Sequence, residues 1–218
     1  MKNKCLILLL SVFLFNSCIG LKVDIQMNRD GSGRLTMEYR LSRALESIGT
    51  LDGNEKWPPV PVGRQDWERA ISRINGTRLA SFSSAQKGQD TITTVVLNFD
   101  NAEALLFILD PQGKNSRFTA NGRHGEFQYI LNDAALGEMP VYDANLIELA
   151  KTMFAGYDFS ISLRASENST LTLTDAKGSA ITPPQNARVI TSGRKVSMVM
   201  EIMDLIDMPN GIGVKINW

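Results

Sequence analysis

A strict alternation of apolar and polar residues constrains the fold of this chain more than any other feature. The alternation runs from Leu21 to Asn28 and returns from Arg34 to Arg40. A period of two is that of a β-strand with one buried face. Between the two stretches, Asp30-Gly31-Ser32-Gly33 supplies the positive-φ residues that a tight turn needs. The sequence therefore predicts a β-hairpin close to the amino terminus.

The same pattern, punctuated by turn residues, predicts strands along most of the remaining chain. We expect the last of them, at 212–218, to be a buried edge strand. The predicted strands after the hairpin are 77–84, 91–99, 117–120, 126–131, 157–163, 170–174, 187–191, 196–202 and 212–218.

Three segments have helical spacing instead. They are Arg64 to Asn75, a short stretch from Ala102 to Leu109 that Asp100 or Asn101 could cap, and Tyr142 to Phe154. The expected class is thus α+β, with a mainly antiparallel β-sheet and about three amphipathic helices packed on it. We expect one domain or two closely packed ones, with a subdivision near residue 156 left open.

The first seventeen residues are typical of an export signal. Two early lysines precede an apolar run from Cys5 to Phe15, which is too short for a comfortable membrane span. Asn16-Ser17-Cys18 follows at once and offers a small residue next to a cleavage position. The sequence therefore predicts a signal peptide at 1–17 and an α+β envelope domain at 18–218.

Residues Phe15-Asn16-Ser17-Cys18 resemble the lipobox of bacterial lipoproteins, whose usual form is Leu, a small residue, Ala or Gly, and then Cys. Ser17 and Cys18 fit this form, whereas Phe15 and Asn16 depart from it. The resemblance implies a palmitate-type lipid attachment at Cys18, which would hold the protein on the outer or the cytoplasmic membrane, facing the periplasm or the exterior. The alternative is an ordinary secretory signal with a coincidental cysteine.

The other bulk features limit the kinds of partner. The chain has two cysteines, Cys5 and Cys18, so a processed and acylated protein would have no disulfide and would rely on its core. Lys and Arg total 23, as do Asp and Glu. Removing Lys2 and Lys4 leaves a net charge of about −2, and the basic residues look scattered rather than clustered. We expect no nucleic-acid partner and membrane binding through lipid alone.

Few residues offer catalytic or metal-binding chemistry. His124 is the only histidine, and a catalytic triad or a histidine-rich metal site needs partners that the sequence lacks. Asp204 and Asp207 could share a helical turn, but a surface turn before Pro209 explains them equally well. The Asp30-Gly31-Ser32-Gly33 turn lacks the spaced acidic ligands of a calcium loop.

Met198, Met200 and Met203 provide soft thioether ligands of the kind that suit Cu(I). A strand would place Met198 and Met200 on one face and turn Met203 away, and methionine is an ordinary core residue. The sequence thus predicts a protein that is not an enzyme and has no metal or cofactor.

The best candidate for a binding surface is Trp57 with Pro58, Pro59 and Pro61. A proline-rich segment is already ordered, and an adjacent tryptophan can anchor a contact at low entropic cost. The alternative is that Trp57 folds back over the sheet.

The order of elements also resembles that of the LppM-like bacterial lipoproteins. The resemblance lies in the hairpin from Val23-Asp24-Ile25 to Asp30-Gly31-Ser32-Gly33, a helix, strands ending in Leu97-Asn98-Phe99-Asp100, and a closing β region. Members of that family often carry a C-terminal membrane span, which this sequence does not show. The resemblance implies an α+β envelope domain without known catalysis.

Two functions from different classes follow. The first is a lipid-anchored envelope module that binds a protein, lipid or glycan. The second is a hydrolase of envelope polymers that uses a pair of carboxylates. The absence of a compact acid/base or nucleophile motif favours the first.

Overall fold

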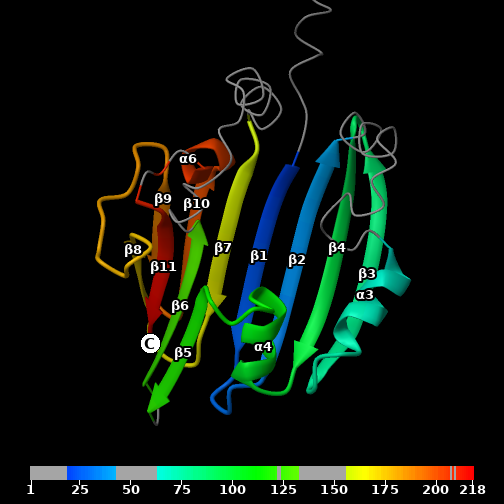
Figure 1. The fold of residues 1–218 in the computed structure, drawn as a ribbon, viewed down its shortest axis with the longest axis horizontal. Helices are drawn as coiled ribbons and strands as arrows, with labels where there is room; N and C mark the ends of the chain where they lie inside the picture. Colours follow the sequence, from blue (N-terminus) through cyan, green and yellow to red (C-terminus); the bar gives the residue numbers. More distant parts are fainter. Residues whose placement is uncertain (1–18, 43–62, 122–123, 133–155, 207, 209) are drawn as a thin grey trace, which may run out of the picture.

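The computed structural model describes residues 19–42, 63–121, 124–132, 156–206, 208 and 210–218. Strands account for 55% of these residues and helices for 14%, so this part of the chain is mostly β (Figure 1). In chain order the elements are β1 (Ile19–Met27), β2 (Gly33–Ser42), α3 (Arg64–Ile71), β3 (Thr77–Lys87), β4 (Asp90–Phe99), α4 (Ala102–Leu109), β5 (Ser116–Asn121), β6 (His124–Asn132), β7 (Asp158–Arg164), β8 (Thr170–Thr174), β9 (Arg188–Ser192), β10 (Lys195–Glu201), α6 (Ile202–Ile206) and β11 (Ile212–Asn217).

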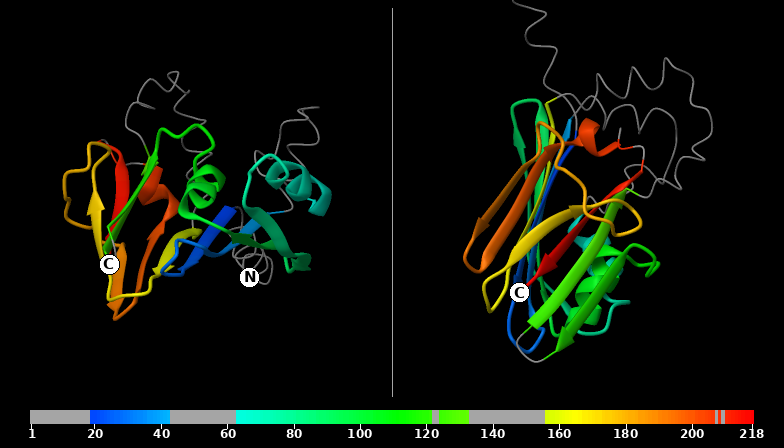
Figure 2. Two further views of the ribbon diagram at one scale, coloured as in Figure 1. Left: turned by 90° about the horizontal axis from the view of Figure 1, so that it is seen from below. Right: turned by 90° about the vertical axis from the view of Figure 1, so that its left-hand side faces the viewer.

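The described strands form two sheets. The larger has seven strands in the order β3-β4-β2-β1-β7-β10-β9, and the smaller has four in the order β5-β6-β11-β8. The smaller sheet lies over the β7-β10-β9 end of the larger one, and helices α3 and α4 lie on the same side (Figures 1 and 2). Each sheet combines strands from before and after residue 156, because β1 pairs with β7 and β6 pairs with β11.

The predicted class, one mainly antiparallel sheet with about three amphipathic helices on it, is wrong in two respects. The seven-stranded sheet is mixed, since β1 and β7 run parallel from the Leu21–Phe159 pair to the Gln26–Arg164 pair. Helices are also a minor part of the described chain, and α6 has only five residues. Alternation reports which face of a strand is buried but not the direction of its neighbour, so the parallel pair left no trace in the pattern.

The predicted strands are all confirmed, with ends that differ by at most three residues. The expected edge position of the last strand is wrong, because β11 lies between β6 and β8. Of the predicted helices, α3 begins at Arg64 but ends at Ile71, and α4 is capped by Asn101, whose side-chain oxygen accepts a hydrogen bond from Ala104 N at 2.8 Å. The helix expected at 142–154 lies outside the described residues.

The β1–β2 hairpin is confirmed, but its two turn glycines serve different purposes. Gly31 has a φ of 81°, which a residue with a side chain rarely adopts. Gly33 does not have a positive φ. A Cβ at Gly33 would instead overlap the carbonyl oxygen of Gln26 and lie 2.5 Å from Cζ of Phe99. The expectation of positive φ therefore holds for Gly31, whereas Gly33 permits a close approach of β1, β2 and β4.

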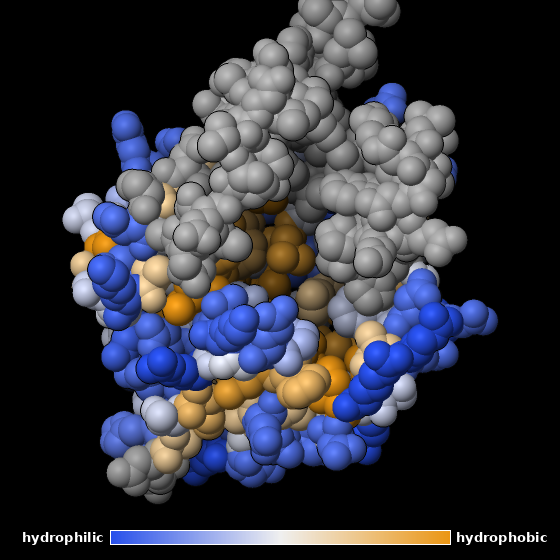
Figure 3. All heavy atoms as spheres, viewed as in Figure 1, coloured by the Kyte–Doolittle hydropathy of each residue, from blue (hydrophilic) through white to orange (hydrophobic). Residues whose placement is uncertain are grey.

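One continuous core joins the two sheets and the helices. From α3, Trp67 and Ile71 are buried, and the Trp67 indole N–H donates to the Tyr39 hydroxyl at 3.3 Å. Apolar colour also shows in a hollow at the centre of the face in Figure 3. The core side chains that are less than 2% exposed and largest are Phe99, Phe127, Ile25, Leu35, Leu97, Leu105, Ile161, Leu163, Met198, Met200, Ile212 and Ile216.

Candidate functional site

The candidate site is a surface of the described chain that lies where the β1–β2 turn meets the end of β7, the start of β6 and the C-terminal residue. We call it the turn end and define it by residues 28–32, 118–120, 124, 164–167, 194 and 218. Two cavities open there, and the turn itself contributes to both, through Asn28 and Arg29. The turn end therefore joins a partly aromatic cavity to a basic one.

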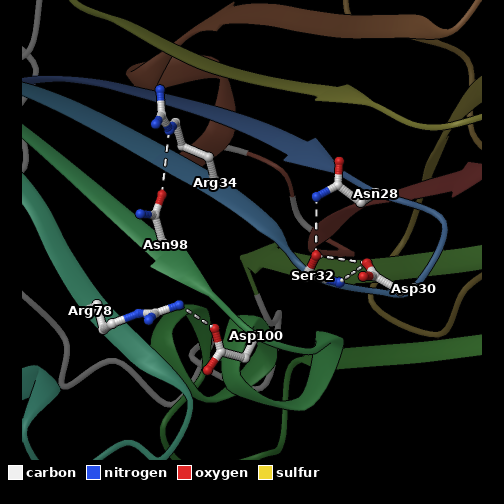
Figure 4. A network of polar contacts seen from close by, with 7 residues as sticks. All are labelled: Asn28, Asp30, Ser32, Arg34, Arg78, Asn98 and Asp100. Atoms are coloured by element: carbon white, nitrogen blue, oxygen red, sulfur yellow. Dashed lines mark hydrogen bonds and ion pairs between the residues drawn. The ribbon is translucent and has the colours of Figure 1, made fainter.

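The turn is rigidified by its own side chains. Asp30 Oδ1 accepts hydrogen bonds from the backbone N–H of Ser32 at 3.0 Å and from the Ser32 hydroxyl at 2.7 Å, and the Asn28 amide donates to Ser32 Oγ at 3.0 Å (Figure 4). The hydroxyl and the backbone N–H of Ser32 lower the pKa of Asp30 below its usual value. The Asp30 carboxylate thus holds the turn, as expected for a turn rather than a calcium loop.

The aromatic cavity has a volume of about 210 Å³ and is bordered by Phe118, Trp218 and His124. The rings of Phe118 and Trp218 are tilted against each other, with centroids 5.7 Å apart. Trp218 is held in place by backbone bonds to Gly125 in both directions, at 2.8 and 3.0 Å. A Cβ on Gly125 would overlap the indole, so this glycine makes room for the aromatic wall.

The basic cavity has a volume of about 390 Å³, and three arginines line it: Arg29, Arg164 and Arg194. Arg29 is paired with Glu167 at 3.0 Å. Among the described residues, no acidic side chain lies within ion-pair distance of Arg164 or Arg194. Both of these arginines are exposed. The expectation that basic residues are scattered is therefore wrong at this place, because strand pairing gathers arginines that are far apart in the sequence.

Two other arginines of the seven-stranded sheet differ from Arg164 and Arg194, because each contacts a polar side chain of a neighbouring strand or its end. Arg78 pairs with Asp100 at 2.8 Å, and Arg34 donates to the side-chain oxygen of Asn98 at 3.4 Å (Figure 4). Both contacts cross between adjacent strands or their ends. The turn end differs in that two of its guanidinium groups line a cavity and have no carboxylate partner within the described part of the chain.

Three shielded carboxylates of the described chain, those of Asp24, Asp90 and Asp110, hold elements together. Burial alone would raise the pKa of Asp110, but N–H groups of Asn115 and Ser116, at 2.6 and 2.8 Å, hold it below its usual value. Burial would also raise the pKa of Asp24, but the Ser162 hydroxyl at 2.6 Å, the Gln26 amide and the Lys195 ammonium group together hold it below its usual value. Asp90 accepts from Arg40 at 2.7 Å and from the Tyr157 hydroxyl at 3.0 Å. These carboxylates serve as structural acceptors.

The candidates taken from the sequence fall in different places. Cys18 and the whole Trp57, Pro58, Pro59 and Pro61 segment lie outside the described residues, so lipid attachment and binding at these positions stay predictions. His124 is exposed at the border of the aromatic cavity. Sequence reasoning found no partner for His124 and missed Trp218 and Phe118 beside it, because the three belong to different strands and strand ends.

The remaining candidates lie away from the turn end. Met198 and Met200 are buried at 0% and 1% exposure, whereas Met203 lies in α6, so the structure places the first two in the core. Asp204 also lies in α6, and its Oδ2 is buried without a hydrogen-bond partner among the described residues. Asp207 lies outside the described residues, so the shared helical turn of Asp204 and Asp207 stays a prediction. Within the described chain, no three His, Cys, Asp or Glu side chains converge as metal ligands would.

No helix in the described part of the chain combines the length and the apolar character needed to span a membrane. No protein-family model matches the chain, and no curated protein sequence matches it significantly. Among solved structures, it is similar to the folded domain of LppM from Mycobacterium tuberculosis, determined by NMR, with 10% sequence identity and a TM-score of 0.44 over 91% of this chain and 88% of that one. The structure thus bears a weak resemblance to LppM.

Proposed function

We propose that this protein is a lipid-anchored binding module of the bacterial cell envelope that takes its ligand at the turn end. The lipid is attached at Cys18, and the partner is an envelope protein, lipid or glycan. The observation that carries the proposal is the pair of adjoining cavities at the end of β1 opposite to Cys18.

The geometry of β1 supports this arrangement. Cys18 is covalently joined to Ile19, the first residue of the strand, while Met27, at its other end, borders both cavities. Eight residue steps at about 3.3 Å each separate Ile19 from Met27, or roughly 26 Å. A lipid on Cys18 would hold one end of a central strand at the bilayer and turn the cavities away from it.

A binding role, rather than hydrolysis, is supported by how the described carboxylates are used. A glycosidase needs two carboxyl groups that flank one substrate bond. The cavities at the turn end contain only one described carboxylate, that of Asp30, and its Oδ1 is occupied by Ser32. The aromatic and basic side chains that line the cavities are instead typical of recognition surfaces.

The anchor is tested by growing cells with an alkyne fatty acid and measuring the label on the protein. We expect labelling of the wild type and none of Cys18→Ala, because acylation requires that thiol. Equal labelling of both would refute the anchor.

The binding surface is tested separately by placing a photo-crosslinking amino acid at His124 or, as an exposed control outside the turn end, at Arg73. Illumination of intact cells should give a discrete adduct of higher mass at His124 that is absent at Arg73. Identical adduct patterns at the two positions, or none at His124, would contradict the assignment of the turn end.

A further inference from the structure

We infer that the basic cavity at the turn end is a binding site for a phosphate group carried by a small molecule, a lipid headgroup or a polymer end. Arg164 and Arg194 are the principal ligands, and Arg29 and Ser166 border the same space. The inference deepens the proposed function by naming the chemistry that the site recognises.

The first argument is charge. Three guanidinium groups line one cavity, and only Arg29 has an acidic partner among the described residues, Glu167. The neighbouring ammonium group of Lys195 is already paired with Asp24 at 3.5 Å. Two positive charges therefore remain without a described counterion, and a phosphate dianion matches that number, whereas a single carboxylate does not.

The second argument is preorganisation. Arg164 ends β7, where it is in register with Gln26 of β1 and Lys195 of β10. The buried residue that follows, Ala165, donates its backbone N–H to the carbonyl oxygen of Arg194 at 2.9 Å. This bond ties the two arginine backbones together at the end of the sheet, so only the side chains, and not the backbone, have to be ordered when an anion binds.

The third argument is the match of donors and space. Each guanidinium presents N–H groups in a planar fork that binds two oxygens of a phosphate at once. The Ser166 hydroxyl adds a donor that can rotate toward a further oxygen. The volume of about 390 Å³ falls within the range of small-molecule sites, so the cavity has room for a phosphate together with part of the group that carries it.

The position of the cavity bears on the source of the phosphate, and this step rests on the proposed lipid anchor. With Cys18 at the bilayer and β1 directed away from it, the cavity opens roughly 26 Å from the anchor. In that orientation the headgroups of the anchoring leaflet are out of reach, which favours a soluble phosphate ester or a phosphate-bearing polymer.

The test compares two double variants of the full chain that remove the same charge. Arg164→Gln/Arg194→Gln alters the cavity, while Arg73→Gln/Arg188→Gln removes two exposed arginines elsewhere. Binding of inorganic pyrophosphate is measured by titration calorimetry, with acetate at equal ionic strength as a comparator. We expect saturable pyrophosphate binding by the wild type, a loss of affinity of at least about tenfold in the cavity variant, and a change of less than about twofold in the control.

A second arm measures co-sedimentation with vesicles of phosphatidylcholine, with or without an equal amount of phosphatidic acid, whose headgroup is a phosphomonoester. Dependence on phosphatidic acid that is lost only in the cavity variant would assign the phosphate to a lipid headgroup. Pyrophosphate binding without that dependence would assign it to a soluble ligand. The inference is overturned if neither probe discriminates the two double variants, or if acetate binds as tightly as pyrophosphate. Fatty-acid labelling at Cys18 is independent of both arms, so failure of the anchor and failure of the phosphate site are distinguishable.

Discussion

The two glycines of the β1–β2 turn should differ sharply in what they tolerate, although the sequence presents them as equivalent. In Gly31→Ala the new Cβ would have ordinary contacts, the nearest being Ala102 N at 3.6 Å, so only the φ of 81° is unfavourable. Left-handed backbone costs an alanine about 1–2 kcal/mol, and the stiffer unfolded chain offsets part of it. We expect Gly31→Ala to lower the free energy of unfolding by about 1 kcal/mol.

Gly33→Ala should cost more, for a different reason. Its Cβ would overlap the Gln26 carbonyl oxygen and lie 2.5 Å from Cζ of Phe99, compared with 3.4–4 Å for an ordinary contact. Phe99 is 1% exposed and cannot move aside freely, and overpacking a core costs about 1–3 kcal/mol. Separating β1 from β2 at the Met27–Gly33 pair sacrifices a further 0.5–1.5 kcal/mol, approximately, for each hydrogen bond lost. The expected loss is about 3 kcal/mol.

Urea unfolding followed by far-ultraviolet circular dichroism measures both changes, with the slope against urea showing whether the unfolded surface is unchanged. Gly88→Ala is a useful third variant, because Gly88 has a φ of 64° and nothing lies within 4 Å of the place that an alanine methyl group would take; it should behave like Gly31→Ala. If Gly33→Ala proves no more destabilising than Gly31→Ala, the close approach of β1, β2 and β4 is not the constraint inferred from the structure.

Two further predictions concern the stability of the fold and of the aromatic wall. Asp110→Ala should lower the free energy of unfolding by about 3 kcal/mol at neutral pH, because three donors from Asn115 and Ser116 lose their acceptor. The control is Asp100→Ala, which removes an exposed ion pair and should lower the free energy of unfolding by less than about 0.5 kcal/mol. Folding lowers the pKa of Asp110, so the carboxylate contributes its full stabilisation above the ordinary aspartate pKa and loses it as the pH falls through the lowered pKa. The loss of stability caused by Asp110→Ala should therefore shrink in acid, and a loss that stays constant would contradict this. Gly125→Ala should lower the free energy of unfolding by about 1–2 kcal/mol, because the new methyl group displaces the Trp218 indole. In a Trp218→Ala background the same substitution should cost less than about 0.5 kcal/mol. Equal costs in the two backgrounds would exclude the clash.

The secondary structure was largely predictable because alternation is a local signal. The alternating residues around Val23 and Ile161 show which side chains are buried, and both strands form as expected. Their parallel pairing was not predictable, since the pattern of burial is the same for either direction of the neighbour. The helix predicted from Arg64 to Asn75 begins where expected and buries Trp67 and Ile71, but α3 ends at Ile71.

The turn end was not predictable because it is assembled by register. Arg164 reaches the β1–β2 turn only because it pairs with Gln26, and Arg194 joins it through the bond from Ala165. Similarly, Trp218 meets Phe118 across the end of β6. Single-sequence reasoning saw these residues as unrelated, and its candidates at Cys18 and Trp57 depend instead on local composition.

The arginine cluster also makes a thermodynamic prediction that separates a ligand site from a structural one. Like charges gathered without counterions oppose folding, so Arg164→Gln/Arg194→Gln should leave the melting temperature unchanged or raise it when no anion is present. A ligand that binds only the folded state adds stability, about 2.7 kcal/mol at a concentration one hundred times Kd, so pyrophosphate should raise the melting temperature of the wild type and not that of the variant. If the arginines served the fold instead, the variant would melt lower in the absence of anion. The sign of that one change therefore decides whether the cluster is maintained for stability or for a ligand.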